Sequence, residues 1–153
     1  MKTYQACLQS HAHCVVCSDG STNPHSLQLS FNQIAENEVA ADYQVDKKHQ
    51  GYIDLLHGGI ASTLLDAAMT HCLLSKGIEA LTAELNVRFH TPVLVGDSVQ
   101  VIGRLISQRR GIYLLEATLS VAKQICVKAT GKFIQPKGGV IQRELPVSVN
   151  CHL

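Results

Sequence analysis

The chain has little charge, few aromatic side chains and no tryptophan. Charged residues make up 16% of its 153 residues, against roughly 25% in an average soluble domain. Its 13 basic and 12 acidic residues give a net charge of +1, and three Phe and four Tyr offer few surfaces for stacking on bases. We therefore expect no nucleic-acid partner. The low charge, together with 46% hydrophobic residues, predicts a folded domain that is partly covered by another subunit.

The sequence also lacks a long uninterrupted apolar run. The longest, residues 60–74, contains Asp66, Thr70 and His71 and is shorter than the roughly 20 residues of a membrane-spanning helix. Residues 1–5 lead into polar sequence without the apolar centre of a signal peptide. We therefore expect a cytoplasmic protein with no membrane association. Its six cysteines are then expected to be reduced thiols.

The length predicts one domain. We expect an irregular N-terminal segment at 1–24, the domain itself at 25–135 and a C-terminal extension at 136–153. Alternating apolar and polar residues predict six antiparallel strands, at 27–31, 39–45, 81–89, 98–107, 112–121 and 125–134. Within 81–89 the alternation is uninterrupted, which places Thr82 on the face opposite Leu81 and Ala83. Residues 47–57 are expected to form a loop.

The apolar run predicts a single buried helix. It opens after His57, Gly58 and Gly59, and Lys76 and Gly77 mark its end. One helix packed against six antiparallel strands is an α+β arrangement. A single helix cannot cover a whole sheet, and a bare sheet edge favours pairing with another chain. We therefore expect self-association.

Asp66 is a carboxylate within this apolar helix. Burying an unpaired carboxylate is costly and raises its pKa. Its neighbours at helical spacing, including Thr63 and Thr70, supply hydroxyls but no cation. Two roles stay open. Asp66 is either a structural residue bonded to Thr63, Thr70 or a neighbouring backbone group, or a carboxylate that lines a cavity and acts as a base or nucleophile.

The start of the helix offers a second candidate group. Backbone N–H groups at a helix N-terminus can stabilise a developing oxyanion, although His-Gly-Gly also fits a simple loop-to-helix turn. Asp66 follows His57 by nine residues, which is roughly 13 Å along a helix. One helix cannot easily aim both groups at one carbonyl. A symmetric dimer with antiparallel helices can, with Gly58 from one subunit and Asp66 from the other.

Residues 57–66, His-Gly-Gly-Ile-Ala-Ser-Thr-Leu-Leu-Asp, resemble the HGGxxxxLxD signature of hotdog-fold thioesterases of the phenylacetate-pathway-like group. Residues 84–89 and Pro92 resemble the strand that follows the central helix of that family, and Gly96-Asp97 resembles its next turn. The resemblance covers about residues 25–135. It implies an antiparallel sheet wrapped around the helix, an edge-to-edge homodimer, and often a homotetramer made of two dimers.

The resemblance also implies an activity, the hydrolysis of an acyl-CoA to a free acid and a thiol without a cofactor or metal. The aspartate matching Asp66 activates water or attacks the thioester. The amide of the glycine matching Gly58 polarises the thioester carbonyl, and Thr82 matches a residue that assists the aspartate or orients water. A non-catalytic module that binds acyl-CoA or lipid is the alternative. The His/Asp or His/Glu arrangement of hotdog hydratases is not found.

Further residues are expected to contact the substrate. His57 and Gly59 flank Gly58. Relatives often carry Asn six residues before the His, where this chain has Gly51. Gln50 beside it offers the same amide donor and acceptor. Arg109 and Arg110, in a tight turn, suit the phosphates of coenzyme A.

Four soft metal ligands lie within seven residues, and they look like half of a zinc knuckle. They are His11, His13, Cys14 and Cys17. The segment also resembles a cysteine-pair stretch that precedes the first strand in some hotdog proteins. We expect a structural or incidental role. A zinc site, as in a zinc-dependent interaction protein, stays open. A redox Cys-x-x-Cys normally opens a helix, and the polar run after Cys17 argues against that.

Overall fold

A computed structural model of the protein describes residues 2–140. In chain order its elements are α1 (Tyr4–Gln9), β1 (Asn32–Ala35), β2 (Glu38–Gln44), the 3-10 helix η1 (Lys47–His49), α2 (Gly58–Leu74), β3 (Leu81–Phe89), β4 (Ser98–Arg109), β5 (Ile112–Val121) and β6 (Gln124–Ile134). None of the helices within residues 2–140 has both the length and the apolar character needed to cross a membrane.

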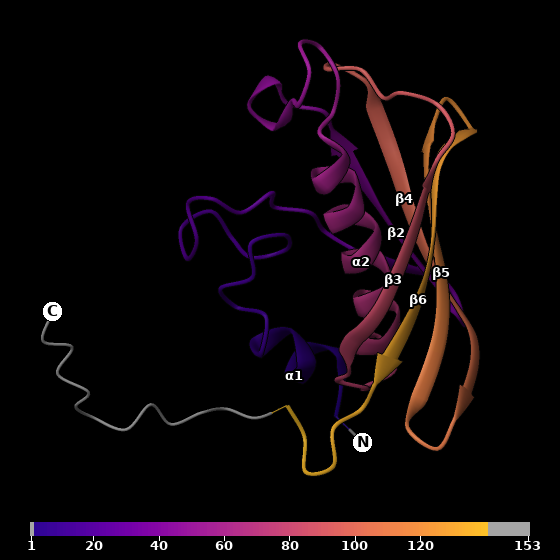
Figure 1. Ribbon diagram of the computed structural model, residues 1–153. Coiled ribbons are helices and arrows are strands. Elements are labelled where there is room, and N and C mark those ends of the chain that lie inside the picture. Colours follow the sequence, from indigo (N-terminus) through magenta and orange to yellow (C-terminus); the bar gives the residue numbers. More distant parts are fainter. Residues whose placement is uncertain (1, 141–153) are drawn as a thin grey trace, which may run out of the picture.

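The six strands form one antiparallel sheet in the order β1-β2-β4-β5-β6-β3. β4, β5 and β6 follow one another as hairpins. β3, which precedes them in the chain, pairs with the far side of β6 and forms an edge of the sheet. The sheet curves around α2, and the N-terminal segment lies on the other side of that helix (Figure 1). The predicted α+β fold, with six strands around one long buried helix, is confirmed.

Small residues let α2 lie directly on the sheet. Gly103 of β4 faces Ala68 of α2 so closely that a Cβ at position 103 would overlap the Ala68 carbonyl group. Larger apolar side chains from both layers are fully buried around this contact: Leu64, Leu65, Met69, Val101, Leu115 and Phe133. Because the sheet covers one side of α2 and the N-terminal segment covers part of the other, the helix is apolar on almost every side.

The prediction of a strand at 27–31 is wrong. Gln28 has a φ of 55°, in the left-handed region, which interrupts an extended strand. The N–H groups of Leu27 and Leu29 donate to the carbonyls of Val15 and Val16, outside the sheet. Leu29 and Phe31 are nevertheless buried. Burial against the N-terminal segment, rather than sheet pairing, produced the alternation.

Local capping explains two further differences from the sequence-based expectations. The N-terminal segment was expected to be irregular, but it contains the short helix α1. Its N-cap, Thr3, accepts a hydrogen bond from the N–H of Ala6. The expected loop at 47–57 begins with η1, which Asp46 caps through the N–H of Lys48. The helix expected at 60–74 and the strands from 81 onward lie within two residues of their predicted bounds.

Candidate active site

Asp66 lines a cavity of about 360 Å³ between α2, β3 and the N-terminal segment. The N-terminal segment contributes His11, Cys14, Val15 and Val16, α2 contributes Ser62, Thr63, Asp66, Ala67, Thr70 and His71, and β3 contributes Leu85. Most of the accessible wall area is apolar, and six of the eleven lining residues contribute polar side chains. This is the usual composition of a small-molecule site.

Asp66 is hydrogen-bonded to a residue of β3. The Oγ1 hydroxyl of Thr82 donates to Oδ1 of Asp66 at 2.8 Å. On the helix itself, the hydroxyls of Ser62 and Thr63 instead donate to the carbonyls of Gly58 and Gly59. Thr63, one of the possible partners of a purely structural Asp66, therefore bonds elsewhere. It brings together Asp66 and Thr82, which the sequence resemblance had paired.

A β-bulge turns Thr82 toward the helix. The pairing of β3 with β6 shifts register between Thr82 and Glu84. As a result Thr82 reaches Asp66, while Leu85 lines the same cavity. Uninterrupted alternation would place residues 82 and 85 on opposite faces of the strand. The prediction of unbroken alternation over 81–89 is therefore wrong at this point.

Burial sets the protonation behaviour of Asp66. Within residues 2–140 the carboxylate forms no ion pair. Its burial raises its pKa above the usual value for Asp, and the hydrogen bond from Thr82 offsets part of this shift. Negative charge on Cys14 raises the pKa further. A carboxylate of raised pKa is a better proton acceptor near neutral pH than an ordinary one.

The N-terminus of α2 offers a backbone donor. His57 is the N-cap, and its Nδ1 accepts the N–H of Gly59 at 2.8 Å. The N–H of Ala61 donates to the His57 carbonyl at 3.0 Å. Within residues 2–140 the N–H of Gly58 has no acceptor, and this residue is exposed. That N–H is therefore available to a ligand.

Gly58 and Asp66 do not share a cavity within one chain. Gly58 lines a separate space of about 520 Å³ with His57 and the preceding loop. Phe89 lies beside it, since a Cβ at position 58 would be 3.4 Å from the Phe89 ring. Strand β3 thus runs from Thr82 at the Asp66 end of the site to Phe89 at the Gly58 end.

The other predicted substrate contacts lie apart from Asp66. The Oε1 atom of Gln50 accepts the N–H of Asp54 and so supports the loop before α2. A Cβ at Gly51 would be 3.2 Å from the His57 ring, which leaves little space for the Asn of relatives. Arg109 and Arg110 are exposed at the turn between β4 and β5 and do not line the Asp66 cavity.

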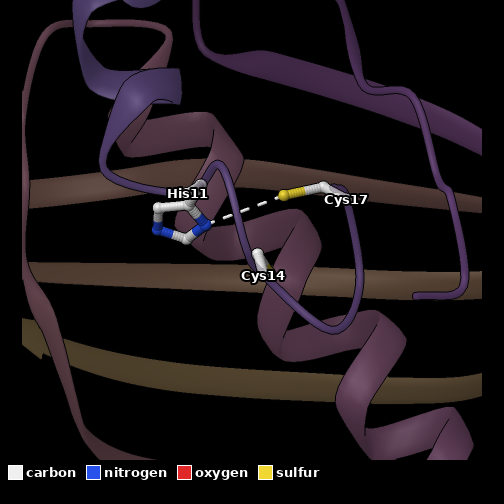
Figure 2. Close-up of side chains that lie close together, drawn as sticks. All are labelled: His11, Cys14 and Cys17. Carbon is white, nitrogen blue, oxygen red and sulfur yellow. Dashed lines mark hydrogen bonds between the residues drawn. The ribbon is translucent and has the colours of Figure 1, made fainter. Parts of the chain in front are cut away.

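Three of the four predicted soft ligands come together. Sγ of Cys17 lies 3.7 Å from Nδ1 of His11, and a ring nitrogen of His11, Sγ of Cys14 and Sγ of Cys17 all lie within 4.8 Å of one another. Figure 2 shows the three side chains on the loop beside α2. The hydrogen bond with the Cys17 thiol lowers the pKa of Cys14 most, and a hydrogen bond with His11 lowers it further. His13 lies outside the group, with its Nδ1 3.4 Å from the Thr22 carbonyl.

His71 is a cavity residue whose surroundings the sequence did not reveal. It is 2% exposed and stacks on Phe31, with 4.4 Å between ring centroids. Its Nδ1 lies 3.0 Å from the Tyr4 hydroxyl, and its buried Nε2 has no partner within residues 2–140. Burial lowers the pKa of His71 to about 4, so the ring is neutral at neutral pH. No sequence pattern predicts these buried surroundings of His71, because Tyr4 and His11 belong to a distant segment of the chain.

Comparison with known proteins places these features in a family context. Residues 54–125 match the family model described as the thioesterase superfamily. Human acyl-coenzyme A thioesterase 13 is 26% identical over 109 residues, which is 70% of this chain and 74% of that protein.

Solved structures resemble the fold. A thioesterase superfamily protein has a TM-score of 0.70 at 23% identity, covering 74% of this chain and 59% of its own. The E. coli PaaI protein has a TM-score of 0.68 at 16% identity, covering 86% of this chain and 89% of its own. A hypothetical thioesterase protein from Streptococcus pneumoniae, solved with coenzyme A, has a TM-score of 0.66 at 18% identity, covering 69% and 86%. These similarities confirm the predicted hotdog fold.

Proposed function

We propose that the chain, which matches the thioesterase superfamily over residues 54–125, hydrolyses acyl-coenzyme A to a free acid and coenzyme A. The observation that carries the proposal is the hydrogen bond from Thr82 to Asp66, a carboxylate whose pKa is raised, in the wall of a mostly apolar cavity. Two similarities support coenzyme A as the carrier. The human relative is an acyl-coenzyme A thioesterase, and the Streptococcus pneumoniae structure holds coenzyme A.

In the proposed reaction Asp66 is the general base. Its carboxylate takes a proton from water as the water oxygen bonds to the thioester carbonyl carbon. The N–H of Gly58 donates to the carbonyl oxygen, which becomes the oxyanion. The carbon–sulfur bond then breaks, and the proton held by Asp66 passes to the leaving sulfur. Thr82 fixes the orientation of the carboxylate throughout.

The proposed site is shared between two copies of the chain. β3 exposes apolar side chains, with Leu81 54%, Leu85 37% and Phe89 55% exposed. Its outer edge pairs with no strand within residues 2–140. A nine-residue edge strand of this kind is a template for pairing with another chain. Pairing of this strand with a second copy buries its apolar side chains and gives its unpaired edge a partner.

The orientation of β3 explains why this pairing would complete the site. A twofold axis near the middle of β3, at Leu85 and Asn86, pairs two β3 strands antiparallel and places Thr82 opposite the partner subunit's Phe89. Thr82 contacts Asp66, and Phe89 lies beside Gly58. The same axis therefore brings Asp66 toward Gly58 of the partner subunit. Assembly of two such dimers into a tetramer and the cytoplasmic location stay predictions.

The test of the activity is thiol release from a panel of short, long and aromatic acyl-CoAs. We expect turnover on at least one class, and its loss in Asp66→Asn. Asp42→Asn is the matched control, because Asp42 is an exposed aspartate on β2. Full turnover in Asp66→Asn would overturn the role of this carboxylate. Absence of turnover on the whole panel by a folded dimer that still binds coenzyme A would favour the binding-module alternative.

A further inference from the structure

The N-terminal segment holds a group of donor atoms that the proposed hydrolysis does not use. The Nδ1 atom of His11 and Sγ of Cys17 are 3.7 Å apart, and one ring nitrogen of His11 and the two Sγ atoms of Cys14 and Cys17 all lie within 4.8 Å of one another (Figure 2). Zinc–sulfur bonds of about 2.3 Å and zinc–nitrogen bonds of about 2.0–2.1 Å, at tetrahedral angles, place nitrogen and sulfur about 3.6 Å apart. The observed separation is therefore close to that of two ligands of one zinc ion.

The chemistry of the three side chains agrees with this geometry. Thiolates and imidazole are the usual zinc donors, and two cysteines separated by two residues are a common ligand spacing. The three residues are half-buried, so an ion there would be partly shielded from water.

The backbone holds the three ligands in place. The N–H of Cys14 donates to the His11 carbonyl at 3.0 Å, and the N–H of Ser18 donates to the Cys14 carbonyl at 3.1 Å. The next residue, Val15, accepts the N–H of Leu27 at 2.8 Å. Two consecutive turns, tied to a neighbouring segment, thus direct the side chains of positions 11, 14 and 17 to one point.

A buried histidine of α2 lies in the same part of the cavity. His71 lines the cavity together with His11 and Cys14, and the His11 and His71 ring centroids are 5.8 Å apart. The buried Nε2 atom of His71 has no hydrogen-bond partner within residues 2–140. Buried polar atoms are normally satisfied. The ring that carries this unpartnered atom therefore packs beside His11, one of the three donor residues.

We propose that His11, Cys14 and Cys17 bind one zinc ion, with the fourth coordination position open toward the cavity. The ion would join the N-terminal segment into a fixed wall beside α2, on the side where Asp66 lies. Binding needs two thiolates and one neutral imidazole, and it releases the thiol protons to solvent. The site does not depend on the proposed hydrolysis.

A redox Cys-x-x-Cys is the competing interpretation of the same residues. Joining Cys14 to Cys17 requires an oxidant and gives no role to His11, whose Nδ1 nevertheless faces Cys17. Both cysteines are free thiols in the structure. The position of the histidine therefore favours a metal over a disulfide.

The test is the metal content of the full-length chain purified under reducing conditions without added metal. We expect about one equivalent of zinc per chain, and less than about a tenth of an equivalent in Cys14→Ser and in His11→Ala. His13→Ala is the matched control and should retain the ion, because His13 lies outside the group. After removal of the ion with a chelator, Co²⁺ should produce the charge-transfer and visible bands of a thiolate-bound tetrahedral ion.

A second measurement keeps the test decisive if a variant folds poorly. Zinc added to the chelator-treated wild-type chain should raise its Tm, whereas Mg²⁺ should not. Zinc below about a tenth of an equivalent, with no cobalt bands and no change in Tm, would overturn the proposal. The redox interpretation would replace the proposal if the metal-free protein forms a Cys14–Cys17 disulfide in air and, once reduced again, binds no zinc.

Discussion

Thr82 donates a 2.8 Å hydrogen bond to Asp66 across the gap between β3 and α2. Two local features create this contact. The bulge between Thr82 and Glu84 turns the hydroxyl toward the helix, and Asp66 is a carboxylate on a helix that is otherwise apolar or hydroxylic around it. The contact orients the carboxylate through one of its oxygens, Oδ1. We regard this pair as the centre of the proposed site.

Removing the Thr82 hydroxyl should lower activity without abolishing it. Thr82→Val keeps the shape of the side chain but loses the donor, and we expect kcat/KM on the best acyl-CoA to fall by about tenfold, the value of one hydrogen bond. Thr82→Ser keeps the hydroxyl and should restore most of the loss. Steady-state kinetics of both variants measure this. Equal activities for the Val and Ser variants would show that the hydroxyl has no role.

The pH profile should report the raised pKa of Asp66. Because the active base is the ionised carboxylate, kcat/KM should rise with pH, with a midpoint above the value of about 3.9 for an ordinary Asp. The Thr82 hydrogen bond lowers this pKa, so Thr82→Val should move the midpoint to still higher pH. Rate measurements from acid to neutral pH test both statements. A midpoint that moves downward in Thr82→Val would contradict the assignment.

The same shift predicts a stabilising substitution. When the folded-state pKa of a carboxyl is raised, its ionised form is disfavoured in the fold, and the resulting loss of stability grows as pH rises from the unfolded-state pKa to the folded-state pKa. Asp66→Asn should therefore increase the free energy of unfolding at neutral pH by about 1 kcal/mol, a common gain when a functional-site strain is removed. The gain should vanish at acid pH, below the unfolded-state pKa. Denaturant unfolding at the two pH values checks this, and a loss of stability at neutral pH would contradict it.

The contact between α2 and the sheet should be sensitive to side-chain size. Gly103→Val places atoms against the Ala68 carbonyl, where even a Cβ has no space. We expect the free energy of unfolding to fall by about 1–3 kcal/mol, as for other overpacked cores. Gly96→Ala provides a contrast, because a Cβ there meets nothing within 4 Å. Any loss of stability in that variant comes from backbone strain at its φ of +91° and not from overpacking. Near-wild-type stability of Gly103→Val would show that α2 can shift away from β4.

The sequence predicted those parts of the fold that depend on local patterns. The apolar run and its end signals predicted α2, and alternation predicted β3 to β6. The motif ending at Asp66, with Thr82, predicted the hydrogen-bonded pair as family positions. The features that were missed depend on contacts between distant segments. The strand pattern at 27–31 fails at Gln28, because Leu27 bonds to Val15 outside the sheet. The surroundings of His71 come from Tyr4 and His11.

The proposed shared site requires the N–H of Gly58 from one subunit and the carboxylate of Asp66 from the other. Gly58 is the first residue of α2, a position where proline is well tolerated and where it removes the N–H. The preceding residue, His57, has the extended backbone that a following proline needs, with ψ of 131°. Gly58→Pro should therefore abolish the oxyanion donor and preserve the helix. Gly58→Ala, which keeps the N–H, is the matched control.

The most direct measurement is the activity of a mixed dimer, purified with two different tags, that pairs an Asp66→Asn chain with a Gly58→Pro chain. If each site takes Asp66 from one subunit and Gly58 from the other, the mixed dimer contains one intact site and one doubly defective site. It should then recover about half of the wild-type activity, while each homodimeric variant stays nearly inactive. If the mixed dimer is as inactive as the two homodimers, both groups act within one chain, and the shared site is wrong.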